Sequence, residues 1–564
     1  FQGFGLDACR LRLLLGYRFS GFRHRRAIPF AKQAVNAQQE LRANNKELSK
    51  EEIQDFKTEW RRLYENLASL LISEGRLSEA QAVLAMEKEE EFVDFIRRDA
   101  TEDLSDSRAM LTDGEETVQE SVETLLSRPI AAATEVAALT ERKNAGRLSG
   151  EDKERLEQLE EVLDTAYSEF MDDVDAFLEN SAEESSDIQR EVDAINLSYT
   201  ADMQDELRVF EGRAAMLQVA SLGDTTHLFL TVPEAAIHRE IAIPRAELSR
   251  LIFEALTAIE ERSPEAQTRL KALYDVLVAP IRAEIDETGA GTLMLNLQGF
   301  LRYVPFAALY DGEHYLIEDY ALSLFTPAAR TEFEAADREP EKSAGFGVTA
   351  AHPGFSPLPG VAQEMQMIFD TGTLAGSASL DDAFTRDSFS TALKARPAIV
   401  HIASHFKLVP GRETDSFLLL GDGSPLNLAE IRKGRNFRFG GVDLLTLSAC
   451  QTARGGDSDG GEVESFGALA QRNGASAVMA TLWPVADEAT ARLMQDFYRG
   501  FVRDGLDKAA ALRAAQIAML RGEATVSASD ERGAKSLAVS APTAAADHRH
   551  PYFWSPFILM GNWL

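Results

Sequence analysis

One apolar stretch of this sequence reads Ala398-Ile399-Val400-His401-Ile402-Ala403-Ser404-His405, and it includes several β-branched residues before its final histidine. A second stretch of the same character reads Val442-Asp443-Leu444-Leu445-Thr446-Leu447-Ser448-Ala449-Cys450 and ends in a cysteine. Runs of this kind are typical of strands buried in a parallel sheet. Because the reactive groups of parallel α/β sheets gather at the carboxyl ends of the strands, the two stretches predict an imidazole and a thiol at one sheet edge.

The length and composition indicate a multidomain protein and argue against its wrapping nucleic acid or lying on an anionic membrane. The chain has 564 residues, of which 45% are hydrophobic, so it exceeds what one core usually organises, and we expect two or three domains. Its formal net charge of −33 at pH 7 opposes contact with phosphate backbones and anionic lipids. No apolar stretch approaches the length of a membrane span.

The cysteines and histidines limit the chemistry further. The only cysteines, Cys9 and Cys450, are far apart in sequence, which argues against a disulfide framework and favours a reducing, cytoplasmic compartment. Cys450 is then expected to be a free thiol. Two distant cysteines and the pair His401 and His405 do not have a usual zinc-ligand spacing, and no phosphate-binding glycine loop follows a predicted strand. We therefore expect no metal and no cofactor.

Four segments of the chain differ in their pattern of apolar and polar residues. Residues 4–100 have a helical pattern, with apolar residues every three or four positions, and residues 101–215 continue as charged helix, which predicts a helical or coiled-coil arm. Short β-like runs over residues 216–342 predict the first, non-catalytic part of an α/β domain. Residues 343–564 alternate strands and helices regularly up to an aromatic strand expected at Tyr552–Leu559, and they form the predicted catalytic part.

One helical segment has a more specific pattern. Residues 63–83 resemble one tetratricopeptide repeat, because small Ala68 and Ala80 stand where two helices would cross closely. Gly75 stands at the turn between them, and an ordinary helical hairpin is the alternative. Since repeats need neighbours and supply extended binding surfaces, we expect further repeats before this segment and a regulatory protein partner bound by them. Phe1-Gln2-Gly3 resembles the remainder of a protease tag site, so we expect a shortened chain.

The two strand ends suit thiol catalysis. A thiol attacks as the thiolate, and a nearby imidazole that takes its proton activates it near neutral pH. The backbone N–H groups of Cys450 and Phe406 are natural donors to an oxyanion. Taken singly, a cysteine or histidine at the end of a buried strand is more often a core residue. Strand alternation puts His401 and His405 on one face and does not choose between them, but the position at the mouth of the strand favours His405.

Wider motifs around the strand ends resemble the CHAT-domain peptidases, relatives of the caspases, gingipains and separases. An ordered set of motifs carries the resemblance: His401–His405, Leu447–Ala453, Gly461–Phe466, Gly474–Val478, Leu482–Thr490 and His550–Trp563. It implies an α/β caspase-like three-layer sandwich preceded by an all-α arm of tetratricopeptide-like repeats and coiled coil. It also implies that Cys450 is the nucleophile and His405 the imidazole. A histidine roughly 50 residues before an Ala-Cys pair agrees with caspase spacing.

The same resemblance suggests a specificity. The segment Trp483–Thr490 resembles the part of separase whose aspartate lines the pocket for an arginine before the scissile bond, and Asp487 is the matching position. A carboxylate there would pair with a guanidinium, and Glu488 and Glu464 are the next candidates for substrate binding. Asp487 is equally suited to capping the helix expected near Glu488, and both interpretations stay open. Most of the clan has a glycine after the catalytic histidine. Phe406 at this position keeps the backbone N–H donor but narrows the access of substrate to the site.

These features favour a cytoplasmic cysteine endopeptidase that uses a His-Cys dyad and cleaves protein substrates after a basic residue. Its helical repeats would recruit a partner or substrate. The alternative is a catalytically silent repeat scaffold whose protease-like domain only binds. Labelling by an arginyl chloromethyl ketone, with and without Cys450, distinguishes the two.

Overall fold

The computed structural model of the chain describes residues 27–44, 50–96, parts of 108–165, 204–326, 342–407, 409, 413–448, 461–485, 487–523 and 548–564. Two compact units are present. The helical unit consists of Phe1–Lys88 and Thr101–Asp202, and the α/β unit consists of Glu89–Ala100 and Met203–Leu564. None of the described helices combines the length and the apolar character that crossing a bilayer requires.

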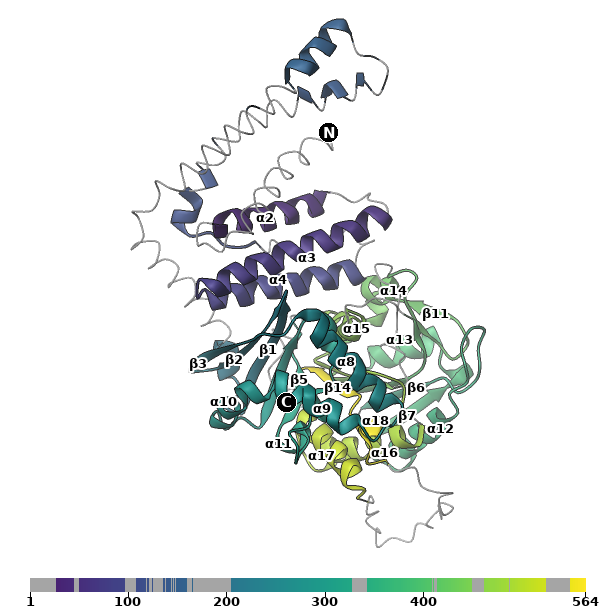
Figure 1. The fold of residues 1–564 in the computed structure, drawn as a ribbon. Helices are drawn as coiled ribbons and strands as arrows, with labels where there is room; N and C mark the ends of the chain where they lie inside the picture. The colour runs from purple at the N-terminus through teal and green to yellow at the C-terminus, as the bar shows by residue number, and fades with distance from the viewer. Residues whose placement is uncertain are drawn as a thin grey trace, which may run out of the picture. The chain divides into compact units, whose positions relative to one another are not determined.

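Three helices form the main part of the helical unit: α2 (Ile28–Asn44), α3 (Lys50–Ser73) and α4 (Leu77–Ile96). They lie side by side in Figure 1, and α2 packs on α3. Gly75 lies in the turn between α3 and α4 with a φ of +74°, a left-handed conformation that favours glycine. The helical hairpin predicted at residues 63–83 is therefore present, while its membership of the tetratricopeptide family stays a prediction.

The predicted arm at residues 101–215 lies largely outside the described residues. Within its described part, residues 150–159 form a helix that Ser149 caps. The Ser149 hydroxyl oxygen accepts the N–H of Asp152 at 3.0 Å, and the Asp152 carboxylate accepts the N–H of Ser149 at 3.0 Å. This reciprocal pair is the capping arrangement that an acidic first turn favours. A coiled coil in the arm stays a prediction.

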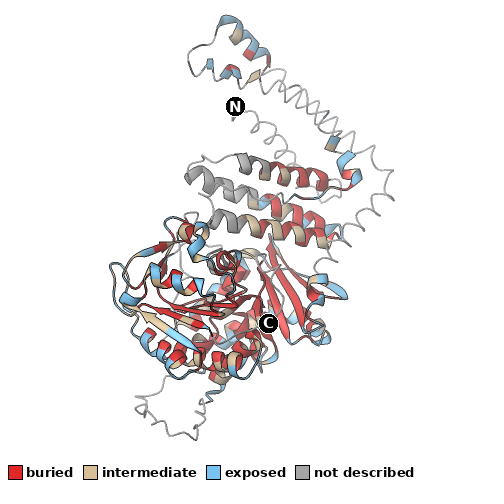
Figure 2. Ribbon diagram, turned by 180° about the vertical axis from the view of Figure 1, so that it is seen from behind, coloured by how far each residue is buried: buried red, intermediate tan, exposed pale blue. Residues whose placement is uncertain are grey.

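A mixed sheet of eleven strands organises the α/β unit (Figure 1), in the order β3-β2-β1-β4-β5-β14-β13-β12-β8-β6-β7. Its apolar strands are largely buried (Figure 2), and all residues of β1, β4, β8, β12 and β13 are buried. The strands are β1 (Ala214–Leu222), β2 (Thr225–Val232), β3 (Ala235–Ile241), β4 (Thr292–Leu297), β5 (Ala321–Leu324), β6 (Ser343–Gly347), β7 (Gly376–Leu380), β8 (Ile399–Ala403), β12 (Leu444–Ser448), β13 (Ala477–Thr481) and β14 (Phe557–Gly561). The structure thus contains a large mixed sheet with helices, which agrees with the α/β class predicted for this part of the chain, and the caspase-like three-layer sandwich stays a prediction.

The two stretches that end at His405 and Cys450 form β8 and β12, which pair as parallel neighbours, as predicted. The strands β13, β12, β8, β6 and β7 are parallel throughout, so their carboxyl ends lie at one edge. The chain passes from β6 to β7 on one side and then to β8 on the other side of β6. The strand order therefore reverses between β6 and β8, which is where ligands bind in open α/β sheets.

The strand β14 joins the two halves of the sheet. It pairs antiparallel with β13, with Thr481 opposite Phe557, and it pairs parallel with β5 through Met560 and Leu324. The prediction of an aromatic strand at Tyr552–Leu559 is wrong in its first part, because Pro551–Trp554 forms the short helix α18. Proline suits the first turn of a helix, since its missing N–H needs no partner there.

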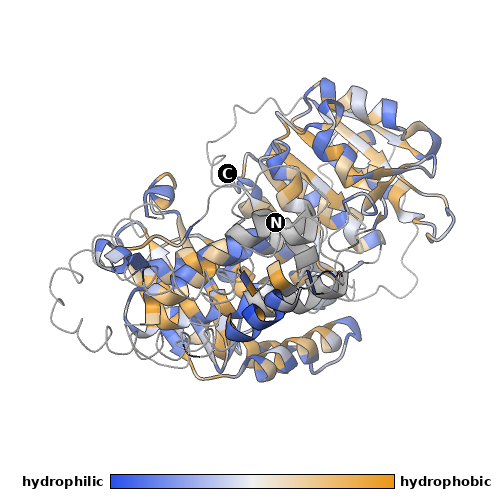
Figure 3. Cartoon of the chain, turned by 90° about the horizontal axis from the view of Figure 1, so that it is seen from above, coloured by the Kyte–Doolittle hydropathy of each residue, from blue (hydrophilic) through white to orange (hydrophobic). Residues whose placement is uncertain are grey.

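Helices cover the sheet and pack on one another. The helix α12 packs on α16, α16 packs on α17, and α15 packs on β13. Hydrophobic colours recur along the strands and alternate with hydrophilic colours on the helices (Figure 3). The described helices of the α/β unit are α8 (Arg245–Glu260), α9 (Ala266–Leu277), α10 (Arg282–Glu287), α11 (Leu316–Asp319), α12 (Gly360–Met365), α13 (Arg386–Lys394), α14 (Leu428–Lys433), α15 (Gly461–Arg472), α16 (Asp487–Tyr498), α17 (Lys508–Arg521) and α18, and π turns continue α12 to Asp370 and α16 to Arg503.

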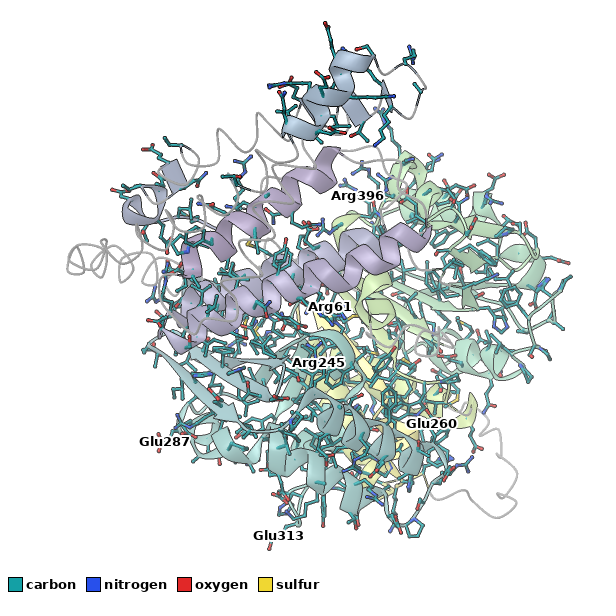
Figure 4. All side chains as sticks on the ribbon, turned by 45° about the horizontal axis from the view of Figure 1, so that its top comes forward. Arg61, Arg245, Glu260, Glu287, Glu313 and Arg396 are labelled. Atoms are coloured by element: carbon teal, nitrogen blue, oxygen red, sulfur yellow. The ribbon has the colours of Figure 1, made fainter. Side chains whose placement is uncertain are left out.

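A second, small sheet follows β8. It consists of β9 (Phe406–Lys407), β10 (Phe417–Leu419) and β11 (Pro425–Asn427), all antiparallel. Charged side chains occupy the surface of the α/β unit (Figure 4), where Glu287, Glu313 and Arg396 are exposed. This distribution agrees with the acidic composition.

Candidate active site

The histidine favoured by the sequence, His405, follows β8 at the carboxyl edge of the large sheet. Its Nε2 lies 2.7 Å from the backbone carbonyl oxygen of Ser356. Because a carbonyl oxygen only accepts, the neutral ring carries its proton on Nε2 and keeps its lone pair on Nδ1. The ring also lies against Phe355, with centroids 5.0 Å apart. A main-chain group therefore orients His405 with Nδ1 available as a base.

The loop that supplies Ser356 follows β6, at the reversal of strand order. The N–H of Leu358 donates to the carbonyl of Thr349 at 3.1 Å and closes this loop. Asp381, at the carboxyl end of β7, holds its beginning by accepting the Thr349 N–H at 2.7 Å and the Thr349 hydroxyl at 2.5 Å. Burial alone would raise the pKa of Asp381, but these hydrogen bonds hold the pKa below its usual range. The loop next to His405 is thus fixed by an ionised carboxylate.

The backbone on both sides of His405 is fixed by the small sheet. The carbonyl of His405 accepts the N–H of Leu419 at 2.9 Å, and the Ser404 hydroxyl donates to the carbonyl of Leu419 at 2.6 Å. Phe406 begins β9, pairs with Leu418 and has a buried side chain. The side chain of Phe406 thus belongs to the core, and the use of its N–H toward an oxyanion stays a prediction.

His401 lies four residues before His405, inside β8, and has a different environment. It is inaccessible to solvent, and its Nε2 lies 3.0 Å from Glu364 Oε1 while its Nδ1 lies 2.9 Å from the hydroxyl of Tyr498. The second carboxylate oxygen of Glu364 accepts the Ser448 hydroxyl at 2.9 Å. Since both ring nitrogens already face oxygen atoms, His401 is suited to packing and not to proton transfer at the sheet edge.

Tyr498 completes this buried polar network. Its hydroxyl donates to Thr446 Oγ1 at 2.7 Å, and Thr446 pairs directly with His401 across the parallel strands. Burial raises the pKa of Tyr498, so the phenol stays protonated and keeps its donor. The network therefore joins α12, β8, β12 and α16 below the sheet edge.

The predicted nucleophile, Cys450, lies outside the described residues, as do residues 449–460. The last described residue of β12 is Ser448, which pairs with Ala403. The structure thus brings the strand that precedes Cys450 beside the strand that precedes His405, and it does not describe the thiol itself.

The three predicted substrate-binding carboxylates are described in part. Asp487 is the first residue of α16, but its side chain lies outside the described residues, and so does that of Glu464 in α15. Glu488 is described and exposed. The segment before Asp487 is attached to α18, because Trp483 Nε1 donates to the carbonyl of Tyr552 at 3.1 Å. Since β13 ends at the same edge as β8, this segment follows the strand on the side where His405 lies.

Several residues of the site carry no signal in the sequence. Ser356 acts through its carbonyl, which every residue has, and Phe355 acts by packing. Glu364 and Tyr498 stand on helices, where a polar residue is usually solvated. Among the described residues, no cluster of three or more His, Cys, Asp or Glu side chains is placed to hold a metal ion.

Comparison with known proteins gives a family. The family model of the CHAT domain matches residues 267–562, more than half of the chain, and the chain therefore belongs to the CHAT-domain family. No curated protein matches it.

Among solved structures, a chain of the Saccharomyces cerevisiae separase–securin complex aligns at a TM-score of 0.42 and 9% identity, over 98% of this chain and 53% of that one. The present chain thus spans about half of its length. The Arg-specific cysteine proteinase gingipain R aligns at a TM-score of 0.32 and 9% identity, over 56% of this chain and 74% of that one. RgpB from Porphyromonas gingivalis, in a complex of its pro- and mature domains, aligns at a TM-score of 0.30 and 9% identity, over 55% and 71%.

Proposed function

We propose that this chain is a cysteine endopeptidase in which Cys450 is the nucleophile and His405 the base. One observation carries the proposal: His405 lies where the strand order reverses, and its Nε2 is held by the Ser356 carbonyl at 2.7 Å. This contact leaves Nδ1 as the proton acceptor, which thiol activation requires. The CHAT-domain match covers both residues and supports the assignment.

The register of the two strands supports the pairing of the dyad. Thr446 pairs with His401 and Ser448 pairs with Ala403, and Cys450 and His405 each follow two residues later. A register that continues for those two residues would set the thiol level with the imidazole. Both residues would also share the sheet face of the residues two positions before them.

The proposed reaction proceeds through an acyl-enzyme. Nδ1 of His405 takes the thiol proton, and the thiolate sulfur forms a bond to the scissile carbonyl carbon. The N–H groups of Phe406 and Cys450 are the proposed donors to the resulting oxyanion. The imidazolium returns its proton to the amine as the C–N bond breaks. Water, deprotonated by His405, then cleaves the thioester and releases the acid and the free thiol.

The proposed substrate is a protein cleaved after a basic residue. Asp487 stands at the start of α16, on a segment held by the contact between Trp483 and Tyr552, and its carboxylate would pair with an arginine guanidinium. Glu488 and Glu464 are the next candidates. Tetratricopeptide-like repeats in the helical unit would recruit substrate or a regulatory partner, and a reducing cytoplasmic compartment would keep the thiol free.

Labelling with a biotinylated arginyl chloromethyl ketone tests the proposal. The wild-type chain should be labelled at Cys450, and Cys450→Ala should lose both labelling and hydrolysis of arginyl reporter peptides with nearly unchanged thermal unfolding, since little volume is lost. Turnover by purified Cys450→Ala would contradict the assignment. A folded wild-type chain that is neither labelled nor active would favour the alternative, a scaffold whose protease-like domain only binds.

A further inference from the structure

In the helical unit, a segment without regular structure, residues 108–112, lies against α2 and is held through its main chain. The side chain of Asn36 makes two hydrogen bonds to Ala109: its Nδ2 donates to the carbonyl oxygen at 3.0 Å, and its Oδ1 accepts the N–H at 2.8 Å. Lys32 Nζ donates to the carbonyl of Met110 at 2.6 Å. Contacts of this kind recognise a backbone and not a particular side chain, so another peptide can make them.

Four charged side chains form a buried ionic cluster beside this segment. Lys32 Nζ lies 2.7 Å from one carboxylate oxygen of Glu79 and 2.8 Å from one of Glu115. Arg76 donates to Glu79 through two nitrogens and to Glu115 through a third, each at 2.6 Å. None of the four residues is more than 4% exposed. Two cations, one from α2 and one from the turn before α4, are therefore balanced by one carboxylate of α4 and by the carboxylate of Glu115, which follows the segment.

Glu115, which follows the segment, is held in a defined local structure. The Thr112 hydroxyl oxygen accepts the N–H of Glu115 at 3.1 Å, and Glu115 Oε2 accepts the N–H of Thr112 at 3.0 Å. This Thr-x-x-Glu pair is a capping box that begins the helix at residue 113. Burial alone would raise the pKa of Glu115, but Lys32 and Arg76 hold the pKa below its usual range. We call the place on α2 and the turn before α4 that residues 108–115 occupy the groove. Without Glu115 the groove would keep a buried excess of positive charge, so any occupant must supply a carboxylate.

The resident segment leaves part of the groove open. A hollow of about 310 Å³ adjoins it, lined from α2 by Gln33 and Asn36 and from the segment by Ala109 and Met110. Gln33 is 6% exposed, and its Nε2 has no hydrogen-bond partner among the described residues. Met110 is 57% exposed. A buried donor beside a hollow is costly unless an acceptor reaches it, and the small Ala109 does not supply one.

We propose that this groove is a peptide-binding site, and that residues 108–115 occupy it as an internal stand-in for a segment of a partner protein. The partner segment is a stretch without regular structure followed by a helix start of the form Thr-x-x-Glu or Ser-x-x-Glu. Its backbone forms the two hydrogen bonds with the side chain of Asn36, and its glutamate forms ion pairs with Lys32 and Arg76. A side chain with a hydrogen-bond acceptor fills the hollow beside Gln33. Binding here needs no peptidase activity, so it is measured independently of the dyad.

The test uses a fluorescein-labelled peptide of residues 106–119 and the full chain, with binding followed by fluorescence anisotropy. In the wild-type chain the tethered segment competes at a high effective concentration and weakens binding of the free peptide. Ala109→Pro removes the N–H that Asn36 accepts and should free the groove, so the peptide should bind this variant at least tenfold more tightly than the wild type. Glu115→Gln in the chain is a second way to free the groove, and it introduces no proline.

Two matched controls examine the chemistry of the groove. Asn36→Asp, added to Ala109→Pro, keeps the shape of the side chain but removes its donor, and it should weaken peptide binding at least tenfold. A peptide with Gln at position 115 should also bind at least tenfold more weakly, because Lys32 and Arg76 lose a carboxylate. Equal binding to the wild type and both freed chains, or binding to neither freed chain, would overturn the proposal. A dimeric wild type that becomes monomeric in Ala109→Pro would assign the groove to a second copy of this chain and would also overturn it.

Discussion

The imidazole Nε2 of His401 lies 3.0 Å from Glu364 Oε1, and neither residue is more than 3% exposed. The same carboxylate accepts the hydroxyl of Ser448, so one side chain of α12 is joined to both strands that lead to the proposed dyad. A desolvated carboxylate with two partners stabilises a core only while both partners are present. The relation between His401 and Glu364 is therefore expected to fix the strand ends and not to transfer protons.

Glu364→Ala should lower the unfolding free energy of the chain by about 3–5 kcal/mol, because His401 and Ser448 lose their acceptor in the core. Glu364→Gln keeps the size and one acceptor oxygen and should cost less than half as much. Urea unfolding followed by circular dichroism measures both. Losses below about 1 kcal/mol for both variants would show that the network contributes little to stability.

His401→Ala should mainly affect stability, whereas His405→Ala should mainly affect activity. His405→Ala removes the proposed base and should lose nearly as much activity as Cys450→Ala, since nucleophile and base act as a unit. His401→Ala should mainly lower the melting temperature, because its two hydrogen bonds are lost in the core. Arginyl reporter hydrolysis and thermal unfolding, measured on the same preparations, separate the two effects. An active His405→Ala variant beside an inactive but stable His401→Ala variant would reverse the choice of base.

Asp381→Ala should reduce kcat about tenfold, because it releases Thr349 and the loop that presents Ser356 to His405. The neighbouring Asp382 is exposed and supplies a matched control, so Asp382→Ala should leave kcat as it is. Reporter kinetics at saturating substrate measure the change. Equal activity of the two variants would show that the loop needs no anchor at Asp381.

The strands at the site could be predicted from the sequence where the pattern of apolar residues determines the secondary structure. The strands β8 and β12 lie inside the two apolar stretches and pair in parallel, because apolar runs of this length suit buried parallel strands. The strand predicted to begin at Tyr552 fails because Pro551 begins a helix, which His550 caps by accepting the N–H of Tyr552 at 3.2 Å. An aromatic run alone does not distinguish the two outcomes.

The contacts around the site follow from the fold and not from any local pattern. The carbonyl of Ser356 has no side-chain signature, and it reaches His405 only because the loop after β6 lies at the reversal of strand order. In the helical unit, Lys32 and Glu79 appear as ordinary charged helix positions, yet both are buried in one ionic cluster. Partners separated by many residues in sequence become visible only in three dimensions.

The pair His227 and His238 should make the α/β unit sensitive to acid. His227 Nδ1 lies 3.1 Å from His238 Nε2, and burial lowers the pKa of His227 to about 4, with a smaller contribution from His238. An unfolded histidine has a pKa near 6.5, so the unfolded chain binds more protons between about pH 6.5 and 4. The stability from this group is present above pH 6.5 and is lost as the pH falls through that window.

The measurement compares urea unfolding of the wild type and His227→Gln from pH 7 to pH 4.5. The wild type should lose more stability than the variant over this range, by on the order of 2–3 kcal/mol, because glutamine does not titrate. The difference between the two chains removes the contribution of the many carboxylates, which is common to both. Parallel curves would mean that His227 is protonated in the folded chain without cost.

Asp487→Ala should cut hydrolysis of arginyl reporters at least a hundredfold and harm neutral reporters much less, because a guanidinium in a partly desolvated pocket would lose its carboxylate. The competing interpretation is that Asp487 only stabilises the start of α16, of which it is the first residue. The chain contains a control aspartate at the start of the next helix. Asp507 caps α17, and its Oδ1 accepts the N–H of Ala510 at 2.7 Å. Asp507→Ala therefore measures what the loss of a helix cap costs here, about 1 kcal/mol of stability with no change in substrate preference. If Asp487→Ala loses similar stability and slows arginyl and neutral reporters equally, Asp487 is a helix cap, and Glu488 and Glu464 become the candidates for the basic-residue pocket.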